Sequence, residues 1–528
     1  MDMEKRTLLA FAISMVIISV WFLVMEPRRA EMQKQAPPQK PNTAAATVAQ
    51  APPATPQTMS EAAVNEEIIV TETPLYRAAW STRGGRLASL KLKRYKESLS
   101  EGANMVEMIK TPMPGLTITG GMSDDNLIYT ASSHGTVVVD HTPYQLTFTA
   151  QMAQGIIVKK VFTIDPAGYL IGYRNTLENQ TDTPLALGTN LTLADRFPVE
   201  GEGSRYTFEG PALLNGKHLE EFKLSKIKKP GAYREFSGQI KWFGFEDKYF
   251  LKAVIIKDAP QTTVTIRRTD EKSVKQTCAL PGVNIKPGYA QTQELALFVG
   301  PKVLGTLKAS GYELGKALDF GFFDIIAKPL LISLNWIEKY VGSYGLGIII
   351  LTFLIKILLY PLTLKSFTSM KELQKVQPLM KEIQQKYKDD KQKLNQALMK
   401  LYQEHKINPM GGCLPMLLQI PILFALYRVF LSSIELRHTP FHIWGTWLPD
   451  LSAKDPYYIT PILMGLSWFV QQKMTPAPGD PMQQKIMMFM PIVFTVMFLN
   501  FPSGLVIYWL VSNILSILQQ AYINRVHA

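Results

Sequence analysis

The decisive stretch of this sequence is Ile486–Asn524, IMMFMPIVFTVMFLNFPSGLVIYWLVSNILSILQQAYIN, in which 39 consecutive residues carry no charge. A helix of about 20 apolar residues crosses the ~30 Å hydrocarbon core of a bilayer, so this stretch is long enough for two crossings. Asn500-Phe-Pro-Ser-Gly504 interrupts it with residues that favour a turn. We therefore predict a hairpin of two short transmembrane helices, which makes this a membrane protein.

Four more apolar stretches lie upstream of this hairpin. Ile407–Tyr427 is uncharged over 21 residues and Tyr457–Gln472 over 16, while Val341–Leu364 carries only one charged residue, Lys356. Thr7–Met25 adds nineteen uncharged residues near the N-terminus. The pattern predicts a multi-domain membrane protein with six transmembrane helices, one as an N-terminal anchor and five as a core.

A cleaved signal peptide is the alternative interpretation of the N-terminal stretch. Its apolar run exceeds the usual ~7–15 residues, and no small-x-small cleavage site precedes Glu26. We therefore assign residues 1–25 to a retained transmembrane anchor. Residues 26–66 are rich in Pro, Ala, Gln and Thr and cannot bury a core, which predicts a disordered tether. The five-helix core is expected over residues 341–528.

Short alternating apolar and polar runs fill residues 67–318, for example Ile156–Ile164, IIVKKVFTI, and Thr262–Arg268, TTVTIRR. A period of two is typical of strands with one buried face, and its extent predicts a large antiparallel β-sandwich. In residues 319–340, apolar side chains recur at helical spacing beside aromatic ones. This pattern predicts an amphipathic helix in the membrane interface, with a helix packed on the β-sandwich as the alternative.

The topology follows from Lys365–Lys406, which holds ten lysines against five acidic residues. Short basic loops stay in the cytoplasm, so both termini should be cytoplasmic and residues 26–340 should lie on the opposite side of the membrane, which is the periplasm in a two-membrane bacterium. We expect this segment, 365–406, to form a helical hairpin that turns near Asp389-Asp390. Its charge suits lipid headgroups, nucleic acid phosphates or acidic protein, and a solvated topology signal is the alternative. The candidate contact residues are Lys371, Lys375, Lys381, Lys386, Lys388, Lys391 and Lys393.

Composition argues against several other classes of protein. The 528 residues include 56 basic and 43 acidic side chains, a net charge of +13, but only two cysteines and seven histidines, which disfavours a disulfide framework or a metal site. Gly311-Tyr-Glu-Leu-Gly-Lys316 has three residues between its glycines, too few for a phosphate-binding loop, and lacks the following Ser or Thr. No nucleophile and base pair stands out. We predict that the protein is not an enzyme and uses no cofactor or metal.

Lys356 is the most informative residue of the predicted core, because a charge inside a span costs roughly 3 kcal/mol or more. It shares a helix face with Thr352 and Tyr360, four residues to either side. The alternatives are that Lys356 reaches the cytoplasmic headgroups and that polar stripes only bond helices together. We instead predict a hydrated groove with Lys356 as its one positive charge. Its expected polar lining is Thr352, Tyr360, Gln419, Thr460, Ser467, Gln471, Tyr508, Ser512, Asn513 and Ser516.

Several motifs resemble those of the Oxa/Alb/YidC family of membrane protein insertases, in the YidC form of Gram-negative bacteria. They are Asn408-Pro-Met-Gly-Gly-Cys-Leu-Pro415, Gln419-Ile-Pro-Ile422, Tyr360-Pro-Leu-Thr363, Asp455-Pro-Tyr-Tyr458, Asp480-Pro-Met-Gln-Gln-Lys485, Phe501-Pro-Ser-Gly-Leu505 and Thr82-Arg-Gly-Gly85. The resemblance implies a multi-pass protein of the bacterial inner membrane, with a periplasmic β-super-sandwich and a five-helix core. The groove of this core is expected to open to the cytoplasm and to lipid and to be closed outward. The resemblance also implies one essential positive charge in the groove, which is arginine in most bacterial members and Lys356 here.

The same resemblance implies that the protein inserts nascent membrane proteins into the phospholipid bilayer and helps them fold, alone or with the Sec translocon, SecYEG and SecDF. No nucleotide hydrolysis and no small-molecule substrate are expected. Some relatives contact the ribosome through a longer basic tail, a role that would pass to the lysine hairpin here. Two other functions remain open, namely a polytopic solute transporter and an envelope glycan-binding protein with a membrane anchor. A transporter would be expected to contain inverted repeats, and the sequence shows no internal repeat.

Overall fold

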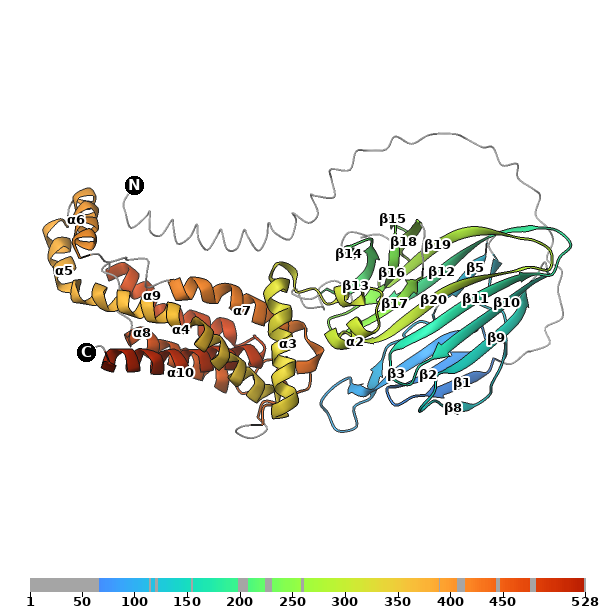
Figure 1. The fold of residues 1–528 in the computed structure, drawn as a ribbon, viewed down its shortest axis with the longest axis horizontal. Helices are drawn as coiled ribbons and strands as arrows, with labels where there is room; N and C mark the ends of the chain where they lie inside the picture. The colour runs from blue at the N-terminus through green and yellow to red at the C-terminus, as the bar shows by residue number, and fades with distance from the viewer. Residues whose placement is uncertain are drawn as a thin grey trace.

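The computed structural model describes residues 66–526, apart from residues 114, 119–121, 153–154, 198–207, 224–229, 258–260, 389, 406–413, 443–446 and 475–480. The predicted anchor, 1–25, and nearly all of the predicted tether, 26–66, lie outside the described residues. The described chain has a β-rich part at one end and a helical part at the other, with α3 between them (Figure 1). We call Ile68–Pro301 the β-domain, and α4 with α7–α10 the helical core.

Twenty strands of the β-domain are described, in three sheets, and they pair antiparallel except for the parallel pair β1–β8. The sheet orders are β4-β3-β2-β1-β8, β14-β13-β16-β17-β20-β11-β10-β9-β7 and β15-β18-β19-β12-β5-β6. The strands are β1 (Ile68–Glu72), β2 (Tyr76–Ser81), β3 (Arg86–Lys96), β4 (Met105–Glu107), β5 (Gly115–Ile118), β6 (Met122–Ser123), β7 (Thr130–Ala131), β8 (Thr136–Val138), β9 (Tyr144–Met152), β10 (Ile156–Ile164), β11 (Leu170–Asn179), β12 (Leu185–Arg196), β13 (Gly210–Asn215), β14 (His218–Glu221), β15 (Tyr233–Gly238), β16 (Ile240–Glu246), β17 (Phe250–Ile256), β18 (Thr262–Arg268), β19 (Ser273–Ile285) and β20 (Ala290–Pro301). The β-rich sandwich predicted from the alternating runs is therefore present.

A buried lysine on the inward face of β10 accounts for the Gly84-Gly85 pair of the β-domain. Lys160 of β10 points into the core and is fully buried, where it forms an ion pair with Asp124. Its ammonium also donates to the carbonyl of Gly84 at 2.6 Å, and Tyr129 donates its hydroxyl proton to Asp124 at 3.0 Å. Gly85 adopts a φ of 51°, and a Cβ there would come within 3.1 Å of Tyr129. The Gly-Gly pair thus lets the chain pass close over this buried pair.

The helical segments are α2 (Leu304–Ala309), η4 (Leu314–Ala317), η5 (Gly321–Phe323), α3 (Asp324–Val341), α4 (Tyr344–Lys375), α5 (Gln377–Lys386), α6 (Lys391–Glu404), α7 (Leu414–Ser432), η7 (Ile434–Leu436), α8 (Ile459–Met474), α9 (Pro481–Phe498) and α10 (Ser503–Val526). Among the described residues, two helices are long and apolar enough to cross a membrane, Tyr344–Lys375 and Ser503–Ile523. Gln419–Ser432 and Met487–Phe498 are apolar but shorter. The total of six spans remains a prediction.

Helix α4 differs from the expected boundary between span and hairpin at residue 365. It continues through 32 residues to Lys375, because residues 365–375 contain no glycine or proline and residues 370–375 are good helix formers. Pro378 then lacks the N–H that would bond to the carbonyl of Gln374, so α4 ends and α5 begins. Beyond this break, α5 and α6 pack together through Val376, Met380 and Leu401.

The β-domain and the helical core are joined by both apolar and polar contacts. Buried side chains of α7 and α3, including Val429 and Leu331, belong to the same hydrophobic cluster as the interior of the β-domain. In the connection after α7, Arg437 lies 5.4 Å from the ring centre of Tyr249 and donates to the carbonyl of Glu97 at 3.2 Å. The Tyr249 hydroxyl lies 3.1 Å from the Ser452 hydroxyl.

Helix α3 is amphipathic in the structure. Ala327, Leu331, Leu334 and Ile337 are buried on one face. On the other face, large apolar and aromatic side chains are exposed, and Ile325 is 83% exposed. Helix α3 crosses the end of the helical core, between it and the β-domain (Figure 1).

Candidate functional site

The predicted polar face of α4 begins with a buried residue and ends with a half-exposed one. Thr352 is 1% exposed and donates its hydroxyl proton to the Ile348 carbonyl at 2.6 Å, one turn back on the same helix. Tyr360 is 39% exposed, two turns further on. Between them, Lys356 reaches across to α10, where its ammonium donates to the Ser516 hydroxyl at 2.7 Å. Among the described residues, no carboxylate lies within ion-pair distance of Lys356.

Helix α10 supplies polar side chains to three neighbouring helices. Gln419 of α7 donates from Nε2 to the Tyr508 hydroxyl at 2.7 Å and to the Ser512 hydroxyl at 3.4 Å. On the side towards α8, Asn513 donates from Nδ2 to the Ser467 hydroxyl at 3.0 Å. Together with the bond from Lys356, these contacts connect α4, α7 and α8 to α10. The structure thus joins five of the predicted polar residues in one bonded set, Lys356, Gln419, Tyr508, Ser512 and Ser516, and two more, Ser467 and Asn513, in a separate pair.

Thr460, a predicted lining residue of α8, has a different bonding partner. Thr460 is 3% exposed at the start of α8, where its backbone N–H and hydroxyl donate to the Asp455 carboxylate at 2.7 and 2.8 Å. Asp455 therefore caps this helix, and Thr460 belongs to the cap. Gln471 is half-buried near the other end of α8.

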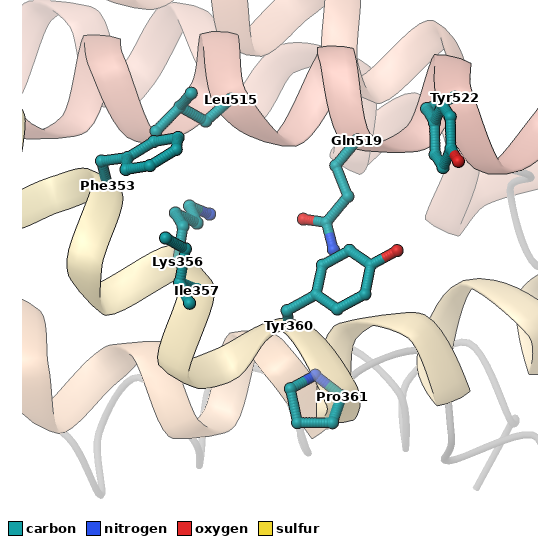
Figure 2. A pocket seen from close by; sticks show the side chains of 8 residues that line it. All are labelled: Phe353, Lys356, Ile357, Tyr360, Pro361, Leu515, Gln519 and Tyr522. Atoms are coloured by element: carbon teal, nitrogen blue, oxygen red, sulfur yellow. The ribbon is translucent and has the colours of Figure 1, made fainter.

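A cavity of about 500 Å³ lies between α4 and α10, next to Lys356 (Figure 2). Its walls are largely apolar, and the polar groups at its border come from Lys356, Tyr360, Gln519 and Tyr522. Figure 2 shows the Gln519 amide lying between Lys356 and Tyr360. The lining residues are Phe353, Lys356, Ile357, Tyr360, Pro361, Leu515, Gln519 and Tyr522.

Gln519 and Tyr522 are lining residues that the sequence pattern did not bring out. The spacing of four residues that joins Tyr508, Ser512 and Ser516 continues to Gln520, which instead donates to the Met474 carbonyl of α8 at 2.7 Å. Gln519 lies seven residues after Ser512, which is also two helical turns. A search at both spacings would have found Gln519, and its Nε2 is buried without an acceptor among the described residues.

The predicted contact lysines of the hairpin lie at the end of α4, in α5 and α6 and, in the case of Lys388, between α5 and α6. Lys375, Lys381, Lys386, Lys388 and Lys393 are exposed, and Lys371 is half-buried. Lys393 pairs with Asp390 at 3.2 Å, and Lys391 begins α6. Figure 1 shows α5 and α6 at the end of the helical core that is remote from the β-domain.

Within the described residues, no group of three or more His, Cys, Asp and Glu side chains is arranged to hold a metal ion. In the β-domain and directly after it, buried lysines pair with buried carboxylates. Lys252 pairs with Asp195, and Lys302 pairs with Glu246 at 3.2 Å. We therefore centre the candidate site on Lys356 and the α4–α10 cavity.

Comparison with known proteins assigns both halves of the chain to one family. The 60Kd inner membrane protein family matches residues 336–528, and the YidC periplasmic domain matches residues 68–333. The membrane protein insertase YidC of Geotalea daltonii is 40% identical over 535 residues, which covers 99% of each chain. That of Geobacter metallireducens is 40% identical over 536 residues, covering 99% of this chain and 98% of the relative. A solved structure described as an active YidC insertase covers 87% of this chain and 94% of its own, at 19% identity and a TM-score of 0.35. Since the 40% identity extends over nearly the whole length of both chains, this chain belongs to the YidC family of membrane protein insertases.

Proposed function

We propose that this insertase moves short polar segments of its clients through a hydrated groove whose one positive charge is Lys356. Family membership supports the insertase activity itself. The observation that carries the proposal is the Lys356 ammonium, which is bonded to a neutral hydroxyl and has no acidic partner among the described residues. A cation held in this way keeps its charge available for an acidic group that enters from outside the protein.

The physical gain comes from the setting of this charge. Two opposite charges 4 Å apart attract by about 1 kcal/mol in water, but by about 4 kcal/mol where the effective dielectric constant is near 20. An acidic tail that enters the cavity beside Lys356 therefore recovers part of the free energy that it loses on leaving water. The membrane potential then favours outward movement of a negative charge by about 2.3 kcal/mol per 100 mV.

The client's hydrophobic segment would meanwhile move along apolar faces of α7 and α9. On α9, the exposed large side chains include Phe489, Ile492, Val493 and Val496. On α7, Ile420 is 38% exposed. Each apolar residue that reaches lipid contributes roughly 0.5 kcal/mol, so the client's own partitioning completes its release and no nucleotide hydrolysis is needed.

The proposed topology places the β-domain in the periplasm and α5 with α6 in the cytoplasm. Their positions at opposite ends of the helical core support this arrangement (Figure 1). Helix α3 would lie in the membrane interface with its exposed apolar face towards lipid. The proposed divisions of the whole chain are the anchor 1–25, the tether 26–66, a periplasmic β-sandwich region 67–318, the interfacial helix 319–340 and the core 341–528 with its hairpin 365–406.

We further propose that the protein works alone or with the Sec translocon, and that it receives nascent chains from the ribosome at the hairpin. The exposed lysines of α5 and α6, such as Lys381 and Lys393, support contact with a phosphate-rich surface. High salt should weaken such contact because it screens exposed charges.

The test uses the full chain reconstituted in vesicles, with two clients that differ only in a short acidic or neutral translocated tail. Lys356→Ala should abolish insertion of the acidic-tailed client and leave the neutral one inserted. Lys356→Arg should retain both, since it keeps the charge. Normal insertion of the acidic-tailed client by Lys356→Ala would show that the groove charge has no such role.

A further inference from the structure

Ser516 is the only described hydrogen-bond partner of the Lys356 ammonium. The other hydrogen bond of its hydroxyl makes the Ser516 oxygen an acceptor for the lysine. The Ser516 hydroxyl donates its single proton to the Ser512 carbonyl, 2.9 Å away and one turn earlier on α10. The oxygen is therefore left with lone pairs only, and the Lys356 ammonium donates to one of them at 2.7 Å. The Ser512 carbonyl thus orients Ser516 as an acceptor for the lysine.

Lysine needs such an acceptor more than arginine would. Its ammonium is a compact charge at the end of a flexible four-carbon stem, and in membrane helices such stems extend towards the nearest water. Lys356 lies nine residues before Lys365, where the predicted cytoplasmic end of the span begins. Without a fixed partner, the charge would move in that direction and away from the cavity.

Ser516 is well placed to prevent this movement. It is 6% exposed, it lies on the helix opposite α4, and it is not itself ionisable. An acidic partner would neutralise the lysine, whereas a hydroxyl holds it and preserves its charge. The ammonium keeps two further N–H donors for water or for a client carboxylate.

We propose that Ser516 is a positioning residue that holds the Lys356 ammonium at the α4–α10 cavity. This inference rests on the proposed function of Lys356 for its effect on insertion. It does not rest on that function for the location of the charge, which can be measured separately.

The first experiment measures insertion by the full chain in vesicles, with the same acidic-tailed and neutral-tailed clients. Ser516→Ala should slow the acidic-tailed client about tenfold, the loss expected for one hydrogen bond to a charged group, and leave the neutral client unchanged. Ser516→Thr keeps the hydroxyl and should restore the rate. In a Lys356→Ala background, Ser516→Ala should leave insertion of the neutral-tailed client unchanged, and a loss there would show a structural role of Ser516 that is independent of the lysine.

Ser310→Ala is the matched control. Ser310 also donates its hydroxyl proton to a carbonyl one turn earlier, that of Thr306, at 2.9 Å, but it lies beside α2 and far from the cavity. Removing this bond should leave both clients unaffected. If Ser516→Ala does not fold, Ser516→Cys provides the same comparison, because a thiol is a weak acceptor of similar size.

The second experiment measures where the charge lies. A water-soluble amine reagent is applied from the cytoplasmic side, and acylation of Lys356 is followed by mass spectrometry. Ser516→Ala should increase the rate of acylation several-fold, and Ser516→Thr should not. An equal rate in Ser516→Ala and the unaltered chain would overturn the proposal.

The two proposals fail in different ways. If Lys356→Ala stops the acidic-tailed client but Ser516→Ala does not, the positioning role is wrong and the groove charge stands. If Lys356→Ala inserts both clients normally, the proposed function is wrong, and the acylation rates alone decide whether Ser516 holds the lysine.

Discussion

Replacing Arg437 should loosen the junction between the β-domain and the helical core. Its guanidinium lies 5.4 Å from the ring centre of Tyr249 and 5.7 Å from that of Phe250, both in or beside β17. It also donates to the Glu97 carbonyl at 3.2 Å. Arg437→Ala removes all three contacts while it leaves the apolar cluster around Val429 in place.

The size of the effect can be worked out from these contacts. Each cation–π contact at a half-exposed site contributes about 0.5–1 kcal/mol, and the hydrogen bond contributes about 1 kcal/mol. The sum is about 2–3 kcal/mol, and each 1.4 kcal/mol corresponds to a factor of about ten. Arg437→Ala should therefore raise the population of the undocked state by about 30- to 140-fold. Arg437→Lys keeps the charge but loses the planar stacking, so its effect should be intermediate.

Hydrogen exchange of the full chain in lipid nanodiscs measures this population. The connection after α7 contains protected amides, including Phe441 bonded to Leu448 and Leu451 bonded to Thr439. These amides should exchange faster in Arg437→Ala, because they belong to the same connection as Arg437, which the substitution releases from the β-domain. Arg267→Ala is the control, since Arg267 stacks on Tyr233 at 5.2 Å within the β-domain. Unchanged exchange in Arg437→Ala would refute the reasoning.

Three further predictions concern stability. Lys160→Met should destabilise the β-domain by about 3–5 kcal/mol in denaturant titrations, because it leaves Asp124 buried without its cation. The double variant Lys160→Met/Asp124→Leu should recover much of this loss of stability. Equal losses in the single and the double variant would contradict this explanation. Burial raises the pKa of Glu246 to about 7, from an ordinary value of 4.5, so the folded state retains a proton that the unfolded chain releases and stability should fall as the pH rises from 4.5 to 7. Glu246→Gln should flatten this slope in thermal melts, and a slope that survives the substitution would assign it to another group. Gly465→Ala should lower the stability of the helical core by about 1–3 kcal/mol, because the new Cβ would overlap the Thr495 hydroxyl of α9. Adding Thr495→Ala should relieve this overlap and restore stability, which thermal melts in detergent measure.

The β-sandwich could be predicted because its strands alternate between core and surface, and a period of two is a local property of the sequence. Lys160 shows what such a local pattern cannot predict, namely the partners that a buried polar residue will have. The period of two places Lys160 on the inward face with Val158 and Phe162, and only the distant Asp124 and Gly84 make a lysine stable there. Such a pairing depends on chain segments that meet only in the folded state.

The candidate site shows the same division between local and distant information. Lys356 was identified because a charge in an apolar run is costly wherever it lies in the bundle. Its bond to Ser516 joins residues 160 positions apart, and no spacing within one helix could predict it. Thr460 matched the spacing of a polar stripe, but its position at the start of α8 makes it part of a cap with Asp455. Helical periodicity says which side a residue faces, and it does not say which neighbour is there.

The continuity of α4 has a mechanical consequence. Its 32 residues form one rod of about 48 Å, at 1.5 Å per residue, whose far end adjoins α5 and α6. The rod has a joint at Pro361, which lacks the N–H that would bond to the carbonyl of Ile357. Lys356 lies five residues from that joint. A displacement of the hairpin is therefore transmitted along α4, and the helix bends most easily at Pro361. Bending there changes the orientation of Lys356 relative to the cavity.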